Sequence, residues 1–188
     1  SNIGGSGQPL QVNSISSLSG LVIGDDLSTS YVQPSTTAFT VNEAITIDGP
    51  VSIFGSKLDI DADVDTSSAN GNIQLVATGG FDVGASGEPT DGIGVHIRGN
   101  NDAQRNIDAG TGSVTVSGTA SSSNADKGNH GVRVFKSSVS GGAGVSITGV
   151  GGGTGSSDNN DGVVLWGATL DTDAGDIVVS GAKGVGSL

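Results

Sequence analysis

The feature that most constrains the fold is a motif that occurs twice, with 31 positions between equivalent residues. Gly131 in the first copy corresponds to Gly162 in the second, and Phe135 corresponds to Trp166 at the same spacing. Repeats of roughly 20–50 residues are typical of solenoids, in which each copy buries its apolar face only against its neighbours. The chain is therefore expected to be an array of stacked units.

Within each copy, apolar residues alternate with other residues. Val132 and Val134 do so in the first copy, and Val163 and Leu165 in the second. Period-two spacing of branched residues between Gly, Asn and Asp clusters predicts short, half-buried strands, and neither copy has helical spacing. Three short strands per unit predict an all-β fold, a parallel β-helix (β-solenoid) with turns of about 31 residues. Its turns would stack at about 4.8 Å, so that equivalent residues form ladders.

Composition supports a thin core and excludes several classes of function. The 188 residues include 34 Gly, aromatic residues make up only 3%, and the formal net charge is −12. An acidic chain repels phosphate backbones, so nucleic-acid binding is not expected. The absence of Cys excludes disulfides and thiolate metal sites. No apolar run of about 20 residues predicts a membrane span.

The repeats divide the chain into two parts. Residues 1–36 are predicted to be an irregular N-terminal segment or a partial turn, and residues 37–188 to be β-solenoid repeats. A third approximate copy begins at Gly94, 37 positions before Gly131, so an insertion is expected within residues 100–105. Because the chain lacks Met and neither terminus resembles a cap, we expect it to be a piece of a longer array.

The residues of the second copy resemble a known family. Its pattern, Gly-Val-x-Leu-x-Gly-Ala-Thr-Leu-x-Thr-x-x-Gly-Asp-Ile-x-Val-x-Gly over residues 162–181, resembles repeats of giant bacterial exoproteins of the filamentous haemagglutinin type. The stretches at residues 3–12 and 71–75 are also similar to that family. The resemblance implies a right-handed parallel β-helix, secreted to the bacterial cell surface, that serves adhesion or forms a long stalk. No functional residue is carried over from it.

Aspartate clusters make calcium a possible ligand of this chain. In residues 58–65, Asp59, Asp61 and Asp63 alternate with apolar residues and are expected to point outward. A second group contains Asp158 and Asp161. Alternate residues of one strand lie about 6.7 Å apart, so ligands from adjacent turns would also be needed. The alternative is that these carboxylates are solvated or form turns.

A candidate partner-binding surface follows from the repeat alignment. If Val132 and Val134 point inward, Phe135 and Trp166 point outward in one column, which Arg98 joins. His96 and Arg133 fall in the adjacent column. A mixed aromatic and cationic surface can hold a sugar ring or a side chain of a partner. The alternative is that the two aromatic rings pack beneath loops.

Catalysis has little support in the sequence. The only histidines, His96 and His130, lack a metal-binding spacing, and no Gly-x-Ser-x-Gly nucleophile motif occurs. The prediction is a non-enzymatic structural segment of a large secreted surface protein, an adhesin stalk or scaffold without a cofactor. Its partners would be neighbouring repeats, identical subunits, or a cell-surface glycan or protein. The alternatives are a self-assembling extracellular filament and, more distantly, a polysaccharide-binding or polysaccharide-degrading β-helix or an ice-binding face.

Overall fold

The computed structural model describes residues 18–24, 38–79, 92–100, 103–122, 128–153 and 159–184. These residues form sixteen β-strands and no helix, so the fold is all-β as predicted. All the strand pairs are parallel, and every third strand along the chain belongs to the same sheet. No described helix could therefore cross a membrane.

Sheet 1 has six strands and contains the longest ones. Its order is β1 (Leu21–Ile23), β4 (Val51–Gly55), β7 (Ile73–Ala77), β10 (Ser113–Thr119), β13 (Gly144–Val150) and β16 (Asp176–Ala182). β1 pairs with β4 and lies within the segment 1–36; most of that segment is outside the described residues, so its predicted boundary is not tested.

Sheets 2 and 3 have five strands each. Sheet 2 has the order β14 (Val163–Trp166), β11 (Val132–Phe135), β8 (Val95–Arg98), β5 (Lys57–Ile60) and β2 (Ala38–Val41). Sheet 3 has the order β15 (Thr169–Asp171), β12 (Ser137–Ser140), β9 (Arg105–Asp108), β6 (Val64–Asp65) and β3 (Ile45–Thr46).

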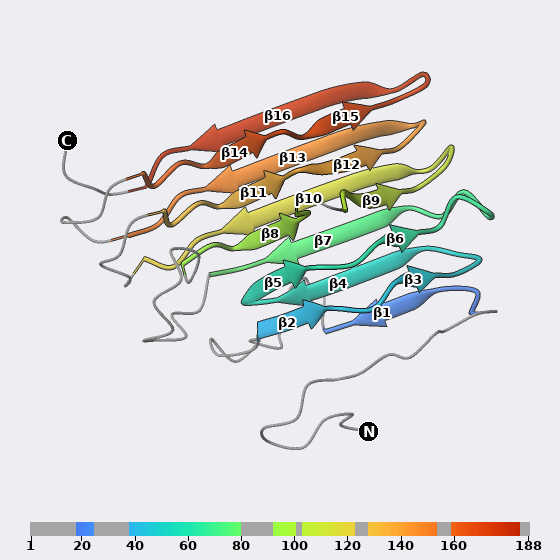
Figure 1. Ribbon diagram of the computed structural model, residues 1–188, viewed down its shortest axis with the longest axis horizontal. Helices are drawn as coiled ribbons and strands as arrows, with labels where there is room; N and C mark the ends of the chain where they lie inside the picture. The colour runs from blue at the N-terminus through green and yellow to red at the C-terminus, as the bar shows by residue number, and fades with distance from the viewer. Residues whose placement is uncertain are drawn as a thin grey trace, which may run out of the picture.

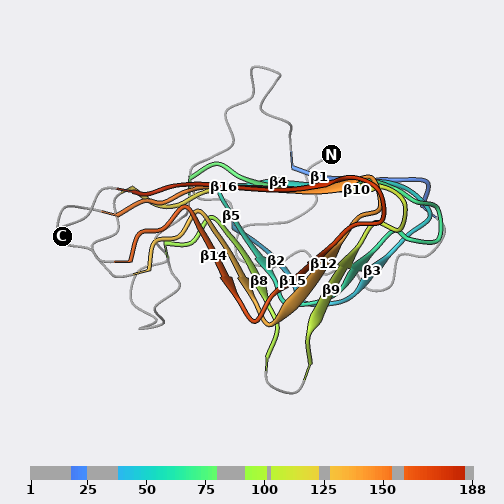
Figure 2. The same ribbon diagram turned by 90° about the horizontal axis from the view of Figure 1, so that it is seen from above.

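The three sheets enclose one interior. Figure 1 shows the strands stacked in sequence order from β1 to β16. Viewed from above, the long sheet 1 forms one side of a roughly triangular outline, and sheets 2 and 3 form the other two sides (Figure 2). This arrangement of three parallel sheets is compatible with the predicted β-solenoid.

The strand register shows where the repeat spacing holds and where it changes. Val132 of β11 pairs with Val163 of β14, 31 positions along the chain. Leu58 of β5 pairs with Val95 of β8, 37 positions along, and with Phe39 of β2, only 19 positions before it. The spacing is thus not uniform, because connections between strands can lengthen or shorten while the paired strands stay in register.

The interior consists of apolar ladders, one residue from each turn. In sheet 1 the residues paired across β4, β7, β10 and β13 include a ladder that is at most 1% exposed: Val51, Ile73, Val114 and Val145. The alternation predicted for residues 58–65 is confirmed, since Leu58, Ile60, Ala62 and Val64 are all buried. However, the segment bends between β5 and β6, so its outward aspartates belong to two different sheets and the connection between them.

The described stack ends in an open turn. Every residue of β16 is exposed. Val145 of β13 is 1% exposed, whereas Ile177, its partner on β16, is 45% exposed. The apolar side chains that would continue the ladders therefore lie open at this end.

Glycines allow two sheets to meet backbone against backbone. A methyl group on Gly149, near the end of β13, would overlap the carbonyl oxygen of Gly162, just before β14. One turn earlier, Gly118 and Gly131 make the same close approach. Only glycine fits such contacts, which explains why these glycines recur in the repeat. We call these two contacts the glycine pairs.

A buried asparagine pair lies near the same corner. The side-chain nitrogen Nδ2 of Asn129 donates a hydrogen bond to Oδ1 of Asn160 at 3.1 Å, and both residues are at most 1% exposed. The two are 31 positions apart, which is the repeat spacing, but the sequence analysis did not identify them. The signal was present, since stacked asparagines form hydrogen-bonded ladders between parallel strands.

Candidate functional site

The candidate site is the outward surface of sheet 2, on the strands β5, β8, β11 and β14. Along these strands, inward residues alternate with outward ones, and the basic and aromatic side chains belong to the outward residues or directly follow the strand. We call this surface the basic–aromatic face and define it by five residues: Arg98, Arg133, Phe135, Lys136 and Trp166.

The register of sheet 2 confirms both predicted columns. Phe135 pairs with Arg98 on one side and Trp166 on the other. Arg133 pairs with His96. Because Val132 and Val134 are fully buried, the residues that alternate with them point away from the interior.

The aromatic and cationic groups contact one another at the C-terminal end of the face. The ring centroids of Phe135 and Trp166 are 5.9 Å apart, with an angle of 71° between the ring planes. The guanidinium carbon of Arg133 lies 5.1 Å from the Phe135 centroid, and Nζ of Lys136 lies 5.2 Å from it. Trp166 is 61% exposed, so the alternative in which it packs beneath a loop does not describe its environment.

Lys136 has an unusual backbone conformation. Its φ of +46° lies in the left-handed region, and the following turn has Gly167 there, with a φ of +62°. The amide of Lys136 donates to the carbonyl of Trp166 at 2.8 Å, so its strand position is fixed by the sheet. A non-glycine residue at such a corner is uncommon and places the ammonium group beside the Phe135 ring.

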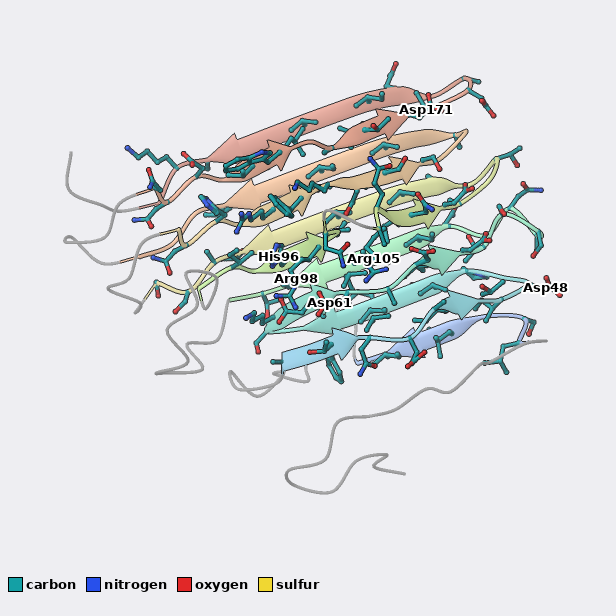
Figure 3. The ribbon with its side chains drawn as sticks, in the orientation of Figure 1. Asp48, Asp61, His96, Arg98, Arg105 and Asp171 are labelled. Carbon is teal, nitrogen blue, oxygen red and sulfur yellow. The ribbon has the colours of Figure 1, made fainter. Side chains whose placement is uncertain are left out.

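Carboxylates pair with the basic groups of the earlier turns. Arg98 makes a bidentate ion pair with Asp61, in which Nε donates at 2.9 Å and Nη2 at 2.6 Å (Figure 3). Nζ of the buried Lys57 lies 3.3 Å from the carboxylate of Asp59. Burial raises the pKa of Asp59, an effect that the Lys57 charge opposes.

His96 occupies the predicted column, but its side chain is not at the surface. It is 2% exposed, and among the described residues its Nε2 has no hydrogen-bond partner. Burial, reinforced by the charges of Arg133, Arg98 and Lys57, lowers its pKa from 6.5 to about 3. His96 is therefore neutral at pH 7, and its side chain is buried on the outward side of the sheet.

The candidate calcium ligands are separated by their own contacts. Asp59 and Asp61 pair with basic groups as described, and Asp63 accepts a hydrogen bond from the amide of Asn106 at 3.0 Å. Asp161 lies 3.6 Å from Nδ1 of His130, and Asp158 lies outside the described residues. Within the described residues, no three acidic, His or Cys side chains lie close enough to hold a metal ion.

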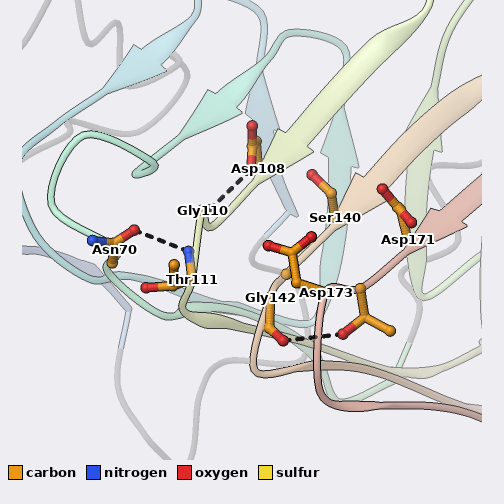
Figure 4. Close-up of a pocket in the computed structure, with 10 residues that line it drawn as sticks. Asn70, Asp108, Gly110, Thr111, Ser140, Gly142, Asp171 and Asp173 are labelled. Carbon is orange, nitrogen blue, oxygen red and sulfur yellow. Dashed lines mark hydrogen bonds between the residues drawn. The ribbon is translucent and has the colours of Figure 1, made fainter.

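A polar pocket of about 310 Å³, which the sequence analysis did not predict, lies where sheet 3 turns into sheet 1 (Figure 4). Asp108, Ser140 and Asp171 line it from successive turns, in register. The signal was their spacing of 31 or 32 positions, obscured because Ser replaces Asp in the middle turn. Asp108 accepts a hydrogen bond from the amide of Gly110 at 2.9 Å, as is typical of a turn.

The chain was compared with family models, curated proteins and solved structures. None of the three comparisons finds a match.

Proposed function

We propose that this chain is a structural segment of a large secreted bacterial surface protein, acting as an adhesin stalk or scaffold. Its coil is a right-handed parallel β-helix with about 31 residues in its regular turns. The chain carries no catalytic function in this proposal.

One observation carries the proposal, the unbroken apolar interior. The sheet 1 ladder of Val51, Ile73, Val114 and Val145 is at most 1% exposed over four turns. Each turn covers the next, so the coil can be extended without changing its cross-section, which suits a rod-like spacer. The right hand is supported by the strong preference for right-handed crossovers between parallel strands. The cell-surface location is supported by the family resemblance.

The test is to lengthen the array by one turn. Residues 132–162, which contain β11, β12 and β13, are duplicated in tandem within the 188-residue chain. If turns are interchangeable structural units, the longer chain will fold, with an unchanged circular dichroism signal per residue. Its urea midpoint will be equal to or higher than that of the original chain, because one more interface between turns is added.

A matched control duplicates only residues 132–146, which is about half a turn. This insertion continues β13 with the residues of β11, so the strands after it fall in the wrong sheets, and it is expected to prevent folding. If the full-turn duplication unfolds or aggregates as the half-turn duplication does, the turns are not interchangeable and the scaffold proposal fails.

The open last turn favours a second candidate, a filament in which another copy of the chain covers that end. Leu165, Ile177 and Val179 point into the stack and are 42%, 45% and 44% exposed. Among the described strands, none pairs with the outer edge of β16, so a parallel strand of another molecule could add there.

Light scattering after size-exclusion chromatography, over a range of protein concentrations, separates the two candidates. A filament subunit will show a mass that rises with concentration, and Ile177→Asp will abolish the rise because a charge on the open end opposes docking. A constant monomeric mass for the unaltered chain contradicts the filament and leaves the stalk.

A further inference from the structure

We infer that the basic–aromatic face binds a carboxylated pyranose chain, that is, a polysaccharide containing uronic-acid units. In this site the exposed Trp166 ring holds the apolar face of a sugar, and the Arg133 guanidinium pairs with the sugar carboxylate. This binding function is additional to the scaffold, and its test does not depend on whether turns can be duplicated.

The first step of the argument is the distribution of charge. The chain has seven Lys and Arg residues against nineteen acidic ones, yet three of the seven lie on this one face of sheet 2, Arg98, Arg133 and Lys136, and a fourth, the buried Lys57, lies on β5 of the same sheet. A local concentration of positive charge on an otherwise acidic chain attracts anions to that place. The ligand is therefore expected to be anionic.

The second step is that the charge of Arg133 is not neutralised by an ion pair with a described residue. Lys57 and Arg98 are each paired with a carboxylate, whereas Arg133 has no ion-pair partner among the residues that the structure describes. Its nearest marked contact is the Phe135 ring at 5.1 Å. Burial and the neighbouring Arg98 charge lower the pKa of Arg133, so an anion bound there would relieve an unfavourable charge.

The third step is the form of the anion. A guanidinium binds a planar carboxylate through two parallel hydrogen bonds, as the Arg98–Asp61 pair on this same face does at 2.9 and 2.6 Å. A ligand carboxylate can bind Arg133 in the same way, one strand further along the stack. This geometry favours a planar carboxylate over a point-like anion.

The fourth step is the aromatic platform. Trp166 is 61% exposed, and Phe135 meets it at 71°, which steadies the indole in an edge-to-face contact. The exposed indole and the Arg133 guanidinium both lie against the Phe135 ring, at 5.9 and 5.1 Å from its centroid, so an apolar surface and a charge flank one residue. A pyranose ring that carries a carboxylate has both complementary features. Successive turns lie about 4.8 Å apart, close to the length of one pyranose unit, so a polymer can follow the stack.

The experiment uses the intact chain and polygalacturonate as the carboxylated probe. Because Trp166 is the only tryptophan, its fluorescence reports directly on binding at this face. We expect saturable quenching by polygalacturonate that weakens as salt is added, and no quenching by the neutral polymer dextran. Calorimetry provides the dissociation constants for variants that lack the indole.

Two variants test the assignment, and one serves as a control. Arg133→Gln and Trp166→Ala are each expected to weaken polygalacturonate binding at least tenfold. Lys183→Gln removes the same charge from an exposed position beyond β16 and is expected to change the dissociation constant less than twofold. Unchanged urea midpoints show that each variant is folded, as expected for Trp166, which is largely exposed.

Several outcomes overturn the inference. These are no binding of polygalacturonate to the unaltered chain, equal binding of dextran, or equal losses from Lys183→Gln and Arg133→Gln. Stronger binding of sulfated dextran that survives Arg133→Gln would show a general charge effect instead of carboxylate recognition. Preference for polyglutamate over polygalacturonate would show that the face takes an acidic protein segment.

Discussion

Removing the same two methyl groups from one ladder should have very different effects at its middle and at its end. Val116 and Val179 both pair with Ile147, on its two sides, so they occupy equivalent positions in β10 and β16. Val116 is fully buried, whereas Val179 is 44% exposed. We therefore compare Val116→Ala with Val179→Ala.

The expected free energies follow from this burial. Burying two methyl groups stabilises a fold by about 1.6 kcal/mol. At Val116 the closed cavity left by the substitution raises the loss to about 2.5 kcal/mol. At Val179 just over half of the side chain is buried and no closed cavity forms, so the loss is about 0.9 kcal/mol.

Urea unfolding followed by circular dichroism measures this difference at low protein concentration, where molecules do not meet end to end. With a urea dependence of about 2 kcal/mol per M, Val116→Ala should lower the midpoint by about 1.2 M and Val179→Ala by about 0.4 M. Equal shifts would refute the reasoning, because they would mean that the inward residues of β10 and β16 are covered to the same degree.

Three further substitutions test other parts of the structure. Gly149→Ala should lower the free energy of unfolding by more than about 3 kcal/mol or prevent folding, because the new methyl group would overlap backbone. The control Gly79→Ala should be tolerated, because nothing lies within 4 Å of its new methyl group. Equal effects of the two substitutions on the urea midpoint would contradict the close contact of the glycine pair. His96 has a pKa of about 3 in the folded chain and an ordinary value of 6.5, so the unfolded chain binds the proton first as the pH decreases. The contribution of His96 to the free energy of unfolding is therefore full above about pH 6.5. It falls as the pH decreases toward 3, by up to about 1.4 kcal/mol per pH unit. His96→Gln should therefore lose less stability than the unaltered chain between pH 7.5 and 5, and an identical pH dependence of the urea midpoints would show that His96 is not the group. Asp61→Asn should cost about 0.5–1 kcal/mol by weakening the partly exposed pair with Arg98, and no change in midpoint would indicate that solvent screens the pair completely.

The sequence predicted the repeated strands because the ladder residues carry the pattern themselves. Val132, Val134 and their equivalents alternate strictly. The 31-position spacing placed Phe135 beside Trp166, and the alignment of the copy that begins at Gly94 placed Phe135 beside Arg98, as the register shows. The spacing failed at β2 and β5, where pairing occurs at 19 positions. Which residues pair depends on the lengths of the connections between strands, and these lengths vary from turn to turn. A fixed repeat spacing in the sequence does not predict them.

The sequence predicted which residues share a column of the candidate site, but not how deeply each side chain is buried. Alternation fixes which side of a strand a residue occupies, so Arg133 and His96 were both assigned to the outward side. It does not fix what lies over that side, and His96 is buried there while Trp166 is open. The ion pair between Arg98 and Asp61 was missed because it joins residues 37 positions apart through the sheet and a bend.

Because of the glycine pairs, the connection between sheets 1 and 2 can change in length without changing the geometry of the coil. The backbones of Gly149 and Gly162 touch, and between these two residues Gly153 and Asn160 still hydrogen-bond to neighbouring turns. Residues added between Gly153 and Asn160 are expected to alter neither strand register nor the interior, since both of these residues remain bonded to neighbouring turns. Such positions are permissive for grafting, so that a foreign peptide or an antigenic epitope could be displayed there, one per turn, along an otherwise unchanged rod.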